Sequence, residues 1–137
     1  MVTIVDTSLV IAYLVPESGS AVARTAMLAA DVVISSDLLP MEILNAAANM
    51  ARRKRAAWPD LEAMLDQVPR LPITLLDHRP QLPAARVICT QTGAVAYDAI
   101  LIALAEHCGS PLFTLDARLG RTLAGTPWER WVRVIGE

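Results

Sequence analysis

Short apolar runs alternate along the chain with longer segments of helical periodicity. The predicted buried strands are 3–5, 32–34, 73–76 and 112–115, and 131–135 is a candidate edge strand. The predicted helices are 9–15, 17–30, 37–55, 59–68, 79–93, a segment that begins at Asp98, and 116–123. Strands that alternate with helices in this way are typical of βαβ units. The pattern therefore predicts an α/β fold with a parallel sheet and helices on both faces.

The most apolar of these segments is 96–119, and it also carries two aspartates. Residues 99–105 (AILIALA) have no polar side chain, which predicts a helix that is buried almost all round. Asp98 stands at the start of this helix, and Asp116 follows the strand 112–115. Two carboxylates held close together repel each other unless a positive charge lies between them. A cation is therefore expected wherever the fold brings this pair together.

Two more acidic residues occupy similar positions in other segments. Asp6 follows the first strand, and Glu42 lies one turn into the helix 37–55, on the same side as Asn45 and Asn49. In open α/β sheets, sites form at the carboxyl ends of the strands. Clustered carboxylates suit Mg²⁺ or Mn²⁺, which prefer oxygen ligands. Two such ions about 4 Å apart activate a water molecule and stabilise the leaving oxygen of a phosphodiester.

Each of these four acids also has a purely structural interpretation. Asp6, Asp98 and Asp116 are suited to cap helices, and Glu42 is suited to an exposed helix surface. Spacing alone leaves both interpretations open. A binding module that uses its acids only as caps therefore remains an alternative to an enzyme.

Composition limits the classes of protein to which the chain can belong. The 137 residues are 54% hydrophobic and 19% charged, which predicts one domain over 1–137 with a sizeable core. The net charge of −2 gives no sign of a nucleic-acid binder. Cys89 and Cys108 lack metal-binding spacing, so we expect free thiols in a reducing cytoplasm. No apolar run reaches about 18 residues, so no membrane span is predicted.

Two other α/β classes lack their motifs in this chain. A phosphatase with an aspartyl nucleophile has a second aspartate two residues after the first, where this chain has Ser8. A receiver domain needs a lysine after its last strand, and the only lysine here is Lys54. Neither class accounts for the four acids.

Three stretches of the chain resemble the PIN-domain family, and specifically its VapC-type toxins. They are VDTSLVIAYL (5–14), SSDLLPMEILNAA (35–47) and YDAILIALAEHCGSPLFTLDARL (97–119), and they stand in the family's order and near its spacing. The resemblance implies a PIN-like three-layer α/β/α sandwich with a central parallel sheet. It also implies a cytoplasmic endoribonuclease that depends on Mg²⁺ or Mn²⁺, forms a homodimer and is inhibited by a cognate antitoxin.

The resemblance assigns the four acids to one catalytic, metal-binding site. Asp6 matches the family's first metal-binding aspartate, Glu42 the glutamate of the third helix, Asp98 the aspartate of the YDA motif, and Asp116 the fourth acid. By this assignment Asp6 and Asp98 bind the first ion most directly, while Glu42 and Asp116 complete the pocket. Hydrolysis would leave 5′-phosphate and 3′-hydroxyl ends.

Residues next to the four acids both match the family and depart from it. Thr114 stands where relatives often have Ser or Thr, and Asn45 matches a frequent asparagine. Val95 replaces a Ser or Thr that many relatives carry three residues before the aspartate of the YDA motif, and Leu39 and Pro40 stand where relatives often have Ser or Thr before the glutamate. Loss of such hydroxyls is expected to loosen ligand orientation.

The main cationic run has two interpretations. Arg52, Arg53, Lys54 and Arg55 suit either a contact with the RNA backbone or a solvated helix end whose positive charges complement the helix dipole. The function itself also has an alternative within the family, a PIN ribonuclease that works in RNA processing without an antitoxin.

Overall fold

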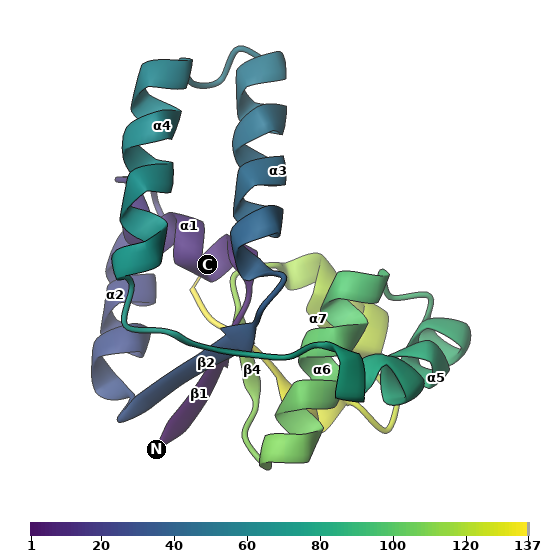
Figure 1. Ribbon diagram of the computed structural model, residues 1–137. Helices are drawn as coiled ribbons and strands as arrows, with labels where there is room; N and C mark the ends of the chain where they lie inside the picture. The colour runs from purple at the N-terminus through teal and green to yellow at the C-terminus, as the bar shows by residue number, and fades with distance from the viewer. Residues whose placement is uncertain (137) are drawn as a thin grey trace.

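A computed structural model describes residues 1–136 and contains one five-stranded parallel sheet (Figure 1). The strands are β1 (Val2–Val5), β2 (Val32–Ser36), β3 (Thr74–Leu76), β4 (Leu112–Thr114) and β5 (Val132–Val134). Their order in the sheet is β3-β2-β1-β4-β5, and each neighbouring pair is parallel. The predicted parallel sheet is therefore confirmed, and β5 is an edge strand as expected.

Helices cover both faces of this sheet. They are α1 (Thr7–Leu14), α2 (Ser20–Ala29), α3 (Leu39–Arg52), α4 (Trp58–Gln67), α5 (Leu82–Thr92), α6 (Ala96–Cys108) and α7 (Ala117–Leu123). Adjacent strand residues point to opposite sides, so Ile4 packs with α5, α6 and α7 while Val5 packs with α1 to α4. These two separate cores make the three-layer α/β/α sandwich that the resemblance implies.

Helix α6 is the most deeply buried helix. All seven residues from Ala99 to Ala105 are buried, as the unbroken apolar run predicts. The helix ends at Gly109, whose φ of 66° is the left-handed conformation that suits a glycine cap. Burial on every side fixes the position of this helix, and with it the position of Asp98 in its first turn.

The starts of several helices differ from the prediction: α1 begins at Thr7, α5 at Leu82 and α6 at Ala96. Two other starts show the physical reason. The helix expected from Asp37 begins at Leu39, after Leu38, with no side-chain cap; Pro40 lies in its first turn as expected. The carboxylate of Asp37 instead accepts a hydrogen bond from the backbone N–H of His78, so a tertiary contact replaces the cap. The helix expected from 17 begins at Ser20, because 17–19 form a turn in which the hydroxyl of Ser20 binds the backbone.

The sheet reverses its strand order beside β1. From β1 the chain moves to β2 and β3 on one side, and β4 and β5 lie on the other. The crevice outside the carboxyl ends of β1 and β4 is therefore the place where α/β sheets bind ligands. Helices α3 and α4 form a hairpin that projects beyond this edge (Figure 1).

Among the described residues, no single helix is long and apolar enough to cross a membrane. One pair, Arg79–Thr92 and Ala96–Cys108, passes on length and composition only when taken together, and it is bent by 117°.

Candidate active site

Asp6 lies at the carboxyl end of β1 and is only 5% exposed. Its Oδ1 accepts hydrogen bonds from the backbone N–H of Leu9 at 3.0 Å and from the hydroxyl of Ser8 at 2.7 Å. Its Oδ2 accepts a hydrogen bond from the hydroxyl of Thr114. Burial raises the pKa of Asp6, these hydrogen bonds oppose the rise, and the charge of Asp116 adds to it. One oxygen therefore caps α1 while the other faces β4.

Thr114 joins the ends of β1 and β4. Its hydroxyl donates to Asp6 and accepts from the backbone N–H of Asp116 at 3.0 Å. The carboxylate of Asp116 accepts from the N–H of Arg118 at 2.9 Å and so caps α7. Ser8 adds a second link, because its hydroxyl accepts from the N–H of Leu115 at 3.2 Å. Sequence reasoning gave Ser8 no role at the site, although it lies two residues after Asp6.

Asp98 shows that the four predicted acids share one electrostatic environment. Its side chain is half-buried in the first turn of α6. Burial, together with the negative charges of the other three acids, raises the pKa of Asp98 to about 6, while Arg118 opposes the rise. The charges of three acids from other segments, Asp6, Glu42 and Asp116, therefore act on Asp98.

Glu42 and Tyr97 form another side of the same site. Glu42 is half-buried in the first turn of α3. Burial raises the pKa of Tyr97 to about 12, and the charges of Asp6 and Glu42 contribute. The hydroxyl of Tyr97 is buried beside Thr7 and Ser35, but it has hydrogen-bond geometry to neither. Within the described residues 1–136, the hydroxyls of Tyr97 and Thr7 both lack a hydrogen-bond partner. Unpaired buried hydroxyls are costly, so their presence beside the acids is typical of a ligand site.

A pocket of about 320 Å³ opens beside these acids. Asp98, Asp116 and Arg118 supply its charged lining, and Val95 and Thr122 lie at its wall. Val95 is 64% exposed and is the N-cap residue of α6, where it provides no side-chain hydrogen bond. The pocket therefore places a guanidinium next to two carboxylates. The sequence gave no signal for Arg118, because a single arginine in a short helix has no distinctive pattern.

A second group of ligand-type side chains lies at the ends of β2 and β3. Among the described residues, only Asp37, Asp77 and His78 place three ligand atoms within 4.8 Å of one another. Nδ1 of His78 is 2.8 Å from Asp37, and Arg79 forms an ion pair with Asp77 at 2.7 Å. Arg79 lowers the pKa of Asp77 to about 2. A cation already neutralises this group, so its chemistry is that of a surface ion-pair network.

The four predicted acids fit a metal ion better than this second group does. The donor atoms of the four acids are all carboxylate oxygens. The charges of the other three acids raise the pKa of Asp98, and the charge of Arg118 lowers it only in part. Hard divalent cations take such oxygen ligands, and a bound cation removes the repulsion. The site therefore combines a fixed carboxylate, Asp6, with two less buried ones, Asp98 and Asp116, that line the pocket of about 320 Å³.

Comparison with known proteins identifies relatives of this chain. The model of the PIN domain family matches residues 3–123, a range that includes all four acids. Ribonuclease VapC3 from Pyrobaculum aerophilum is 32% identical over 121 residues, which cover 87% of this chain and 92% of the relative.

Solved structures share the same fold. A crystal structure of a protein from Pyrobaculum aerophilum has a TM-score of 0.69 at 24% identity, covering 90% of this chain and 81% of that one. A toxin–antitoxin complex from Klebsiella pneumoniae contains a chain with a TM-score of 0.63 at 17% identity, with 96% of each chain covered.

Proposed function

The chain belongs to the PIN-domain family, and we propose that it is a metal-dependent endoribonuclease that acts as the toxin of a toxin–antitoxin pair. The observation that carries the proposal is the effect of Asp6, Glu42 and Asp116 on the pKa of Asp98, beside the switch point of the sheet. A relative named as a ribonuclease and a shared fold with a chain of a toxin–antitoxin complex support the activity and the biological role.

The four acids would hold Mg²⁺ or Mn²⁺. When bound there, such an ion neutralises negative charge and assists hydrolysis of a phosphodiester. Asp6 is the anchoring ligand, because Ser8, Leu9 and Thr114 hold both of its oxygens in fixed positions. Asp98 and Asp116 are the ligands that line the pocket. Glu42 and Asp116 complete the set from α3 and from the start of α7.

Arg118 has a separate part in this proposal. It lines the pocket beside Asp98 and Asp116, so a phosphate of RNA that enters the pocket meets a guanidinium as well as the acids. Guanidinium groups bind phosphate oxygens with two parallel hydrogen bonds. Arg118 therefore orients the phosphate, and the acids stand on the side where the bond is cleaved.

The partners proposed for the chain are an RNA substrate, a cognate antitoxin and a second copy of itself, all in the cytoplasm. The alternative within the family is a PIN ribonuclease that works in RNA processing without an antitoxin. A short gene directly upstream that encodes a small DNA-binding protein would favour the toxin. Its absence, together with co-purification of processing factors, would favour the alternative.

Metal binding and cleavage test the proposal together. With Mn²⁺ the purified protein is expected to cleave a single-stranded RNA, and EDTA is expected to stop cleavage. Mn²⁺ is also expected to raise the melting temperature of the wild type but not of Asp6→Asn or Asp98→Asn, because ligand binding stabilises only the state that binds. Glu62→Gln, which changes an exposed acid on α4, is the control. Equal stabilisation of all four proteins would overturn the metal site.

A further inference from the structure

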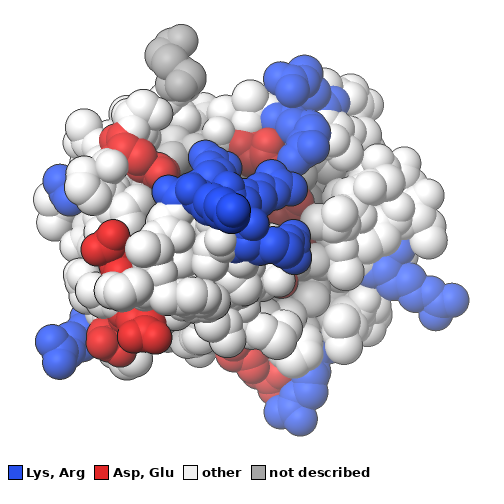
Figure 2. Space-filling model, turned by 90° about the horizontal axis from the view of Figure 1, so that it is seen from above, with Lys and Arg blue, Asp and Glu red and all other residues white. Residues whose placement is uncertain are grey.

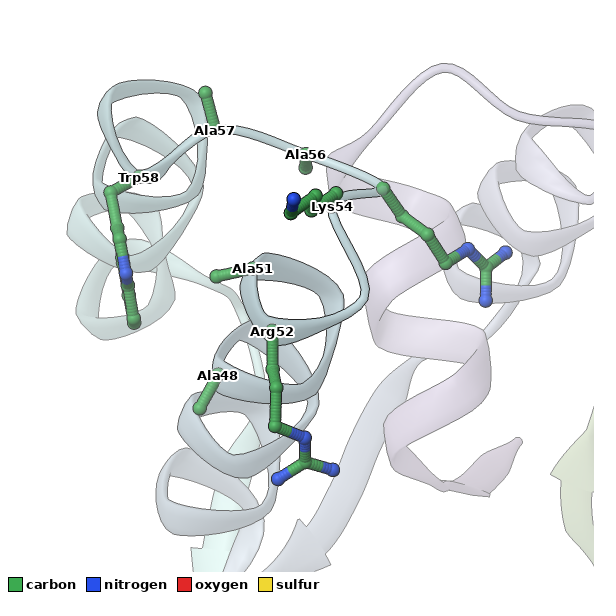
Figure 3. A pocket seen from close by; sticks show the side chains of 8 residues that line it. Ala48, Ala51, Arg52, Lys54, Ala56, Ala57 and Trp58 are labelled. Carbon is green, nitrogen blue, oxygen red and sulfur yellow. The ribbon is translucent and has the colours of Figure 1, made fainter.

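The tip of the α3–α4 hairpin contains a second pocket, of about 620 Å³ (Figure 3). Ala48 and Ala51 of α3 form an apolar surface between Arg52 on one side and Trp58 of α4 on the other (Figure 3). Lys54 lies in the connection above them. The indole of Trp58 is 45% exposed although it is one of the largest apolar side chains in the chain. An aromatic side chain and three cations, Arg52, Lys54 and Arg55, therefore line a pocket with a small apolar surface.

Positive charge is concentrated around this pocket. Residues 52–55 are all exposed, and within the described part of the chain none of them forms an ion pair. Figure 2, which looks down on the hairpin from above, shows Lys and Arg side chains gathered at the centre of this face with acidic side chains beside them. A protein with a net charge of −2 thus presents a local cationic surface.

The backbone of Lys54 has a conformation that glycine adopts at lower cost. Lys54 has a φ of 56° and is the only non-glycine residue with positive φ among those described. Its N–H donates to Ala51 and that of Arg55 donates to Met50, which is the hydrogen-bond pattern of a helix end that normally carries glycine at this position. A lysine there destabilises the fold relative to glycine. Such strain is characteristic of functional positions.

A polar stripe joins this pocket to the carboxylates. Glu42, Asn45, Asn49 and Arg52 follow one another at helical spacing along one side of α3, and Arg52 donates to Asn49 at 2.7 Å. The rise of an α-helix places Arg52 about 15 Å beyond Glu42. That distance corresponds to about four nucleotides of a stacked strand. A single strand whose cleaved bond lies at the acids can therefore reach the tip.

We propose that the pocket at the hairpin tip binds one nucleotide of a single-stranded RNA, a few nucleotides from the cleaved bond. The base stacks on Trp58, and Arg52 and Lys54 hold the adjacent phosphate. Stacking on an exposed aromatic residue inside a cationic groove is the general way in which proteins hold single strands. Cations that form no ion pair within residues 1–136, beside the exposed ring of Trp58, suit the phosphate and the base of a nucleotide together. The inference rests on the proposed ribonuclease function and gives that function a substrate site outside the acids.

Kinetics with two RNA lengths test this proposal. One substrate is a dinucleotide, which cannot span from the acids to the tip; the other is a single strand of about 12 nucleotides, within the size range of such sites. Trp58→Ala and Lys54→Gly are expected to raise KM for the long RNA about tenfold or more and to leave cleavage of the dinucleotide unchanged. Trp58→Phe and Lys54→Arg should restore KM, since they keep the ring and the charge. Arg24→Gln, an exposed arginine on α2, is the control.

Binding of the long RNA in EDTA gives a second measurement. Lys54→Gly should reduce the slope of log K against log salt by about 0.7, which corresponds to one phosphate contact with a single strand. The same variant should melt at a higher temperature than the wild type, so weaker binding would not reflect damage to the fold. Equal KM and equal salt slopes in wild type and variants would overturn the inference. So would a change of oligomeric state in Trp58→Ala with KM unaltered, because the pocket would then be a protein interface.

Failure of the two proposals can be told apart. If the wild type cleaves neither RNA with Mn²⁺, the ribonuclease function is wrong. If it cleaves both and the tip variants match it, the function stands and only the nucleotide site at the tip is wrong.

Discussion

Replacing Asp98 by asparagine is expected to stabilise the protein when no divalent ion is present. The fold raises the pKa of Asp98 from 3.8 to about 6 through burial and through the charges of the other three acids. A folded-state pKa above the unfolded value means that this carboxyl contributes its stability below about pH 4 and loses it as the pH rises through about 6. At neutral pH the ionised Asp98 therefore lowers the free energy of unfolding, and a neutral asparagine at this position would not.

The magnitude follows from the same pKa. The difference between 3.8 and about 6 corresponds to at most about 3 kcal/mol, at 1.36 kcal/mol per pH unit. Asp98 is only half-buried, so solvent screening reduces this to about 1–2 kcal/mol. Loss of a favourable carboxylate in the first turn of α6 costs about 0.5 kcal/mol. We expect a net gain of about 1 kcal/mol, or a rise in melting temperature of about 3 °C for a domain of this size.

Thermal unfolding in EDTA across pH measures this effect. The gain of Asp98→Asn over the wild type should be largest above about pH 7, should shrink as the pH falls through about 6, and should disappear below about pH 4. Glu62→Gln serves as the control for loss of an exposed acid and should show no such pH dependence. A gain that is independent of pH, or a loss of stability at high pH, would refute the argument that the acids repel one another at this site.

Three further variants and conditions test the site. Val95→Ser should raise the free energy of unfolding by about 1 kcal/mol in thermal unfolding, since a serine at this N-cap position can accept a hydrogen bond from the first turn of α6. Thr114→Val should lower the free energy of unfolding by about 2 kcal/mol, because Asp6 loses a hydrogen bond. The same variant should weaken Mn²⁺ binding, measured by titration calorimetry, roughly 10- to 100-fold. Thr114→Ser keeps the hydroxyl and should keep both the stability and the metal affinity. Removal of divalent ions should lower the melting temperature of the wild type but not of Asp6→Asn, and an equal drop in both would place the metal elsewhere.

The fold was predictable because its signals are local. Most strands contain a short run of apolar or β-branched residues, and the unbroken apolar run 99–105 predicts a buried helix. The ends of the helices were less predictable, since tertiary contacts decide them. Asp37 has the chemistry of a cap, yet it binds His78 from a distant segment. The helix predicted to reach Arg55 ends at Arg52 because Lys54 takes a left-handed conformation that a sequence pattern would assign to glycine.

The candidate site was predictable in part. The spacing of the four acids in the sequence left helix capping and metal binding as alternatives. The structure shows why spacing alone could not distinguish these two roles. Asp6 and Asp116 both cap helices and also lie within the acidic site, since a carboxylate has two oxygens. Asp98 caps nothing and lies inside the first turn of α6. Ser8 binds Asp6 locally but also accepts from the N–H of Leu115 across the sheet, and Arg118 lines a pocket with Asp98 of another helix; no local pattern contains these tertiary contacts.

The chemistry of the RNA ends tests the central claim most directly. The purified protein is incubated with total RNA and Mn²⁺, and the new ends are sequenced by a method that requires a 5′-phosphate. The wild type is expected to produce new 5′-phosphate ends, which EDTA or Asp98→Asn abolishes. Ends that persist in EDTA, that appear equally with Asp98→Asn, or that carry 5′-hydroxyl groups would contradict cleavage by a metal site built from the four acids.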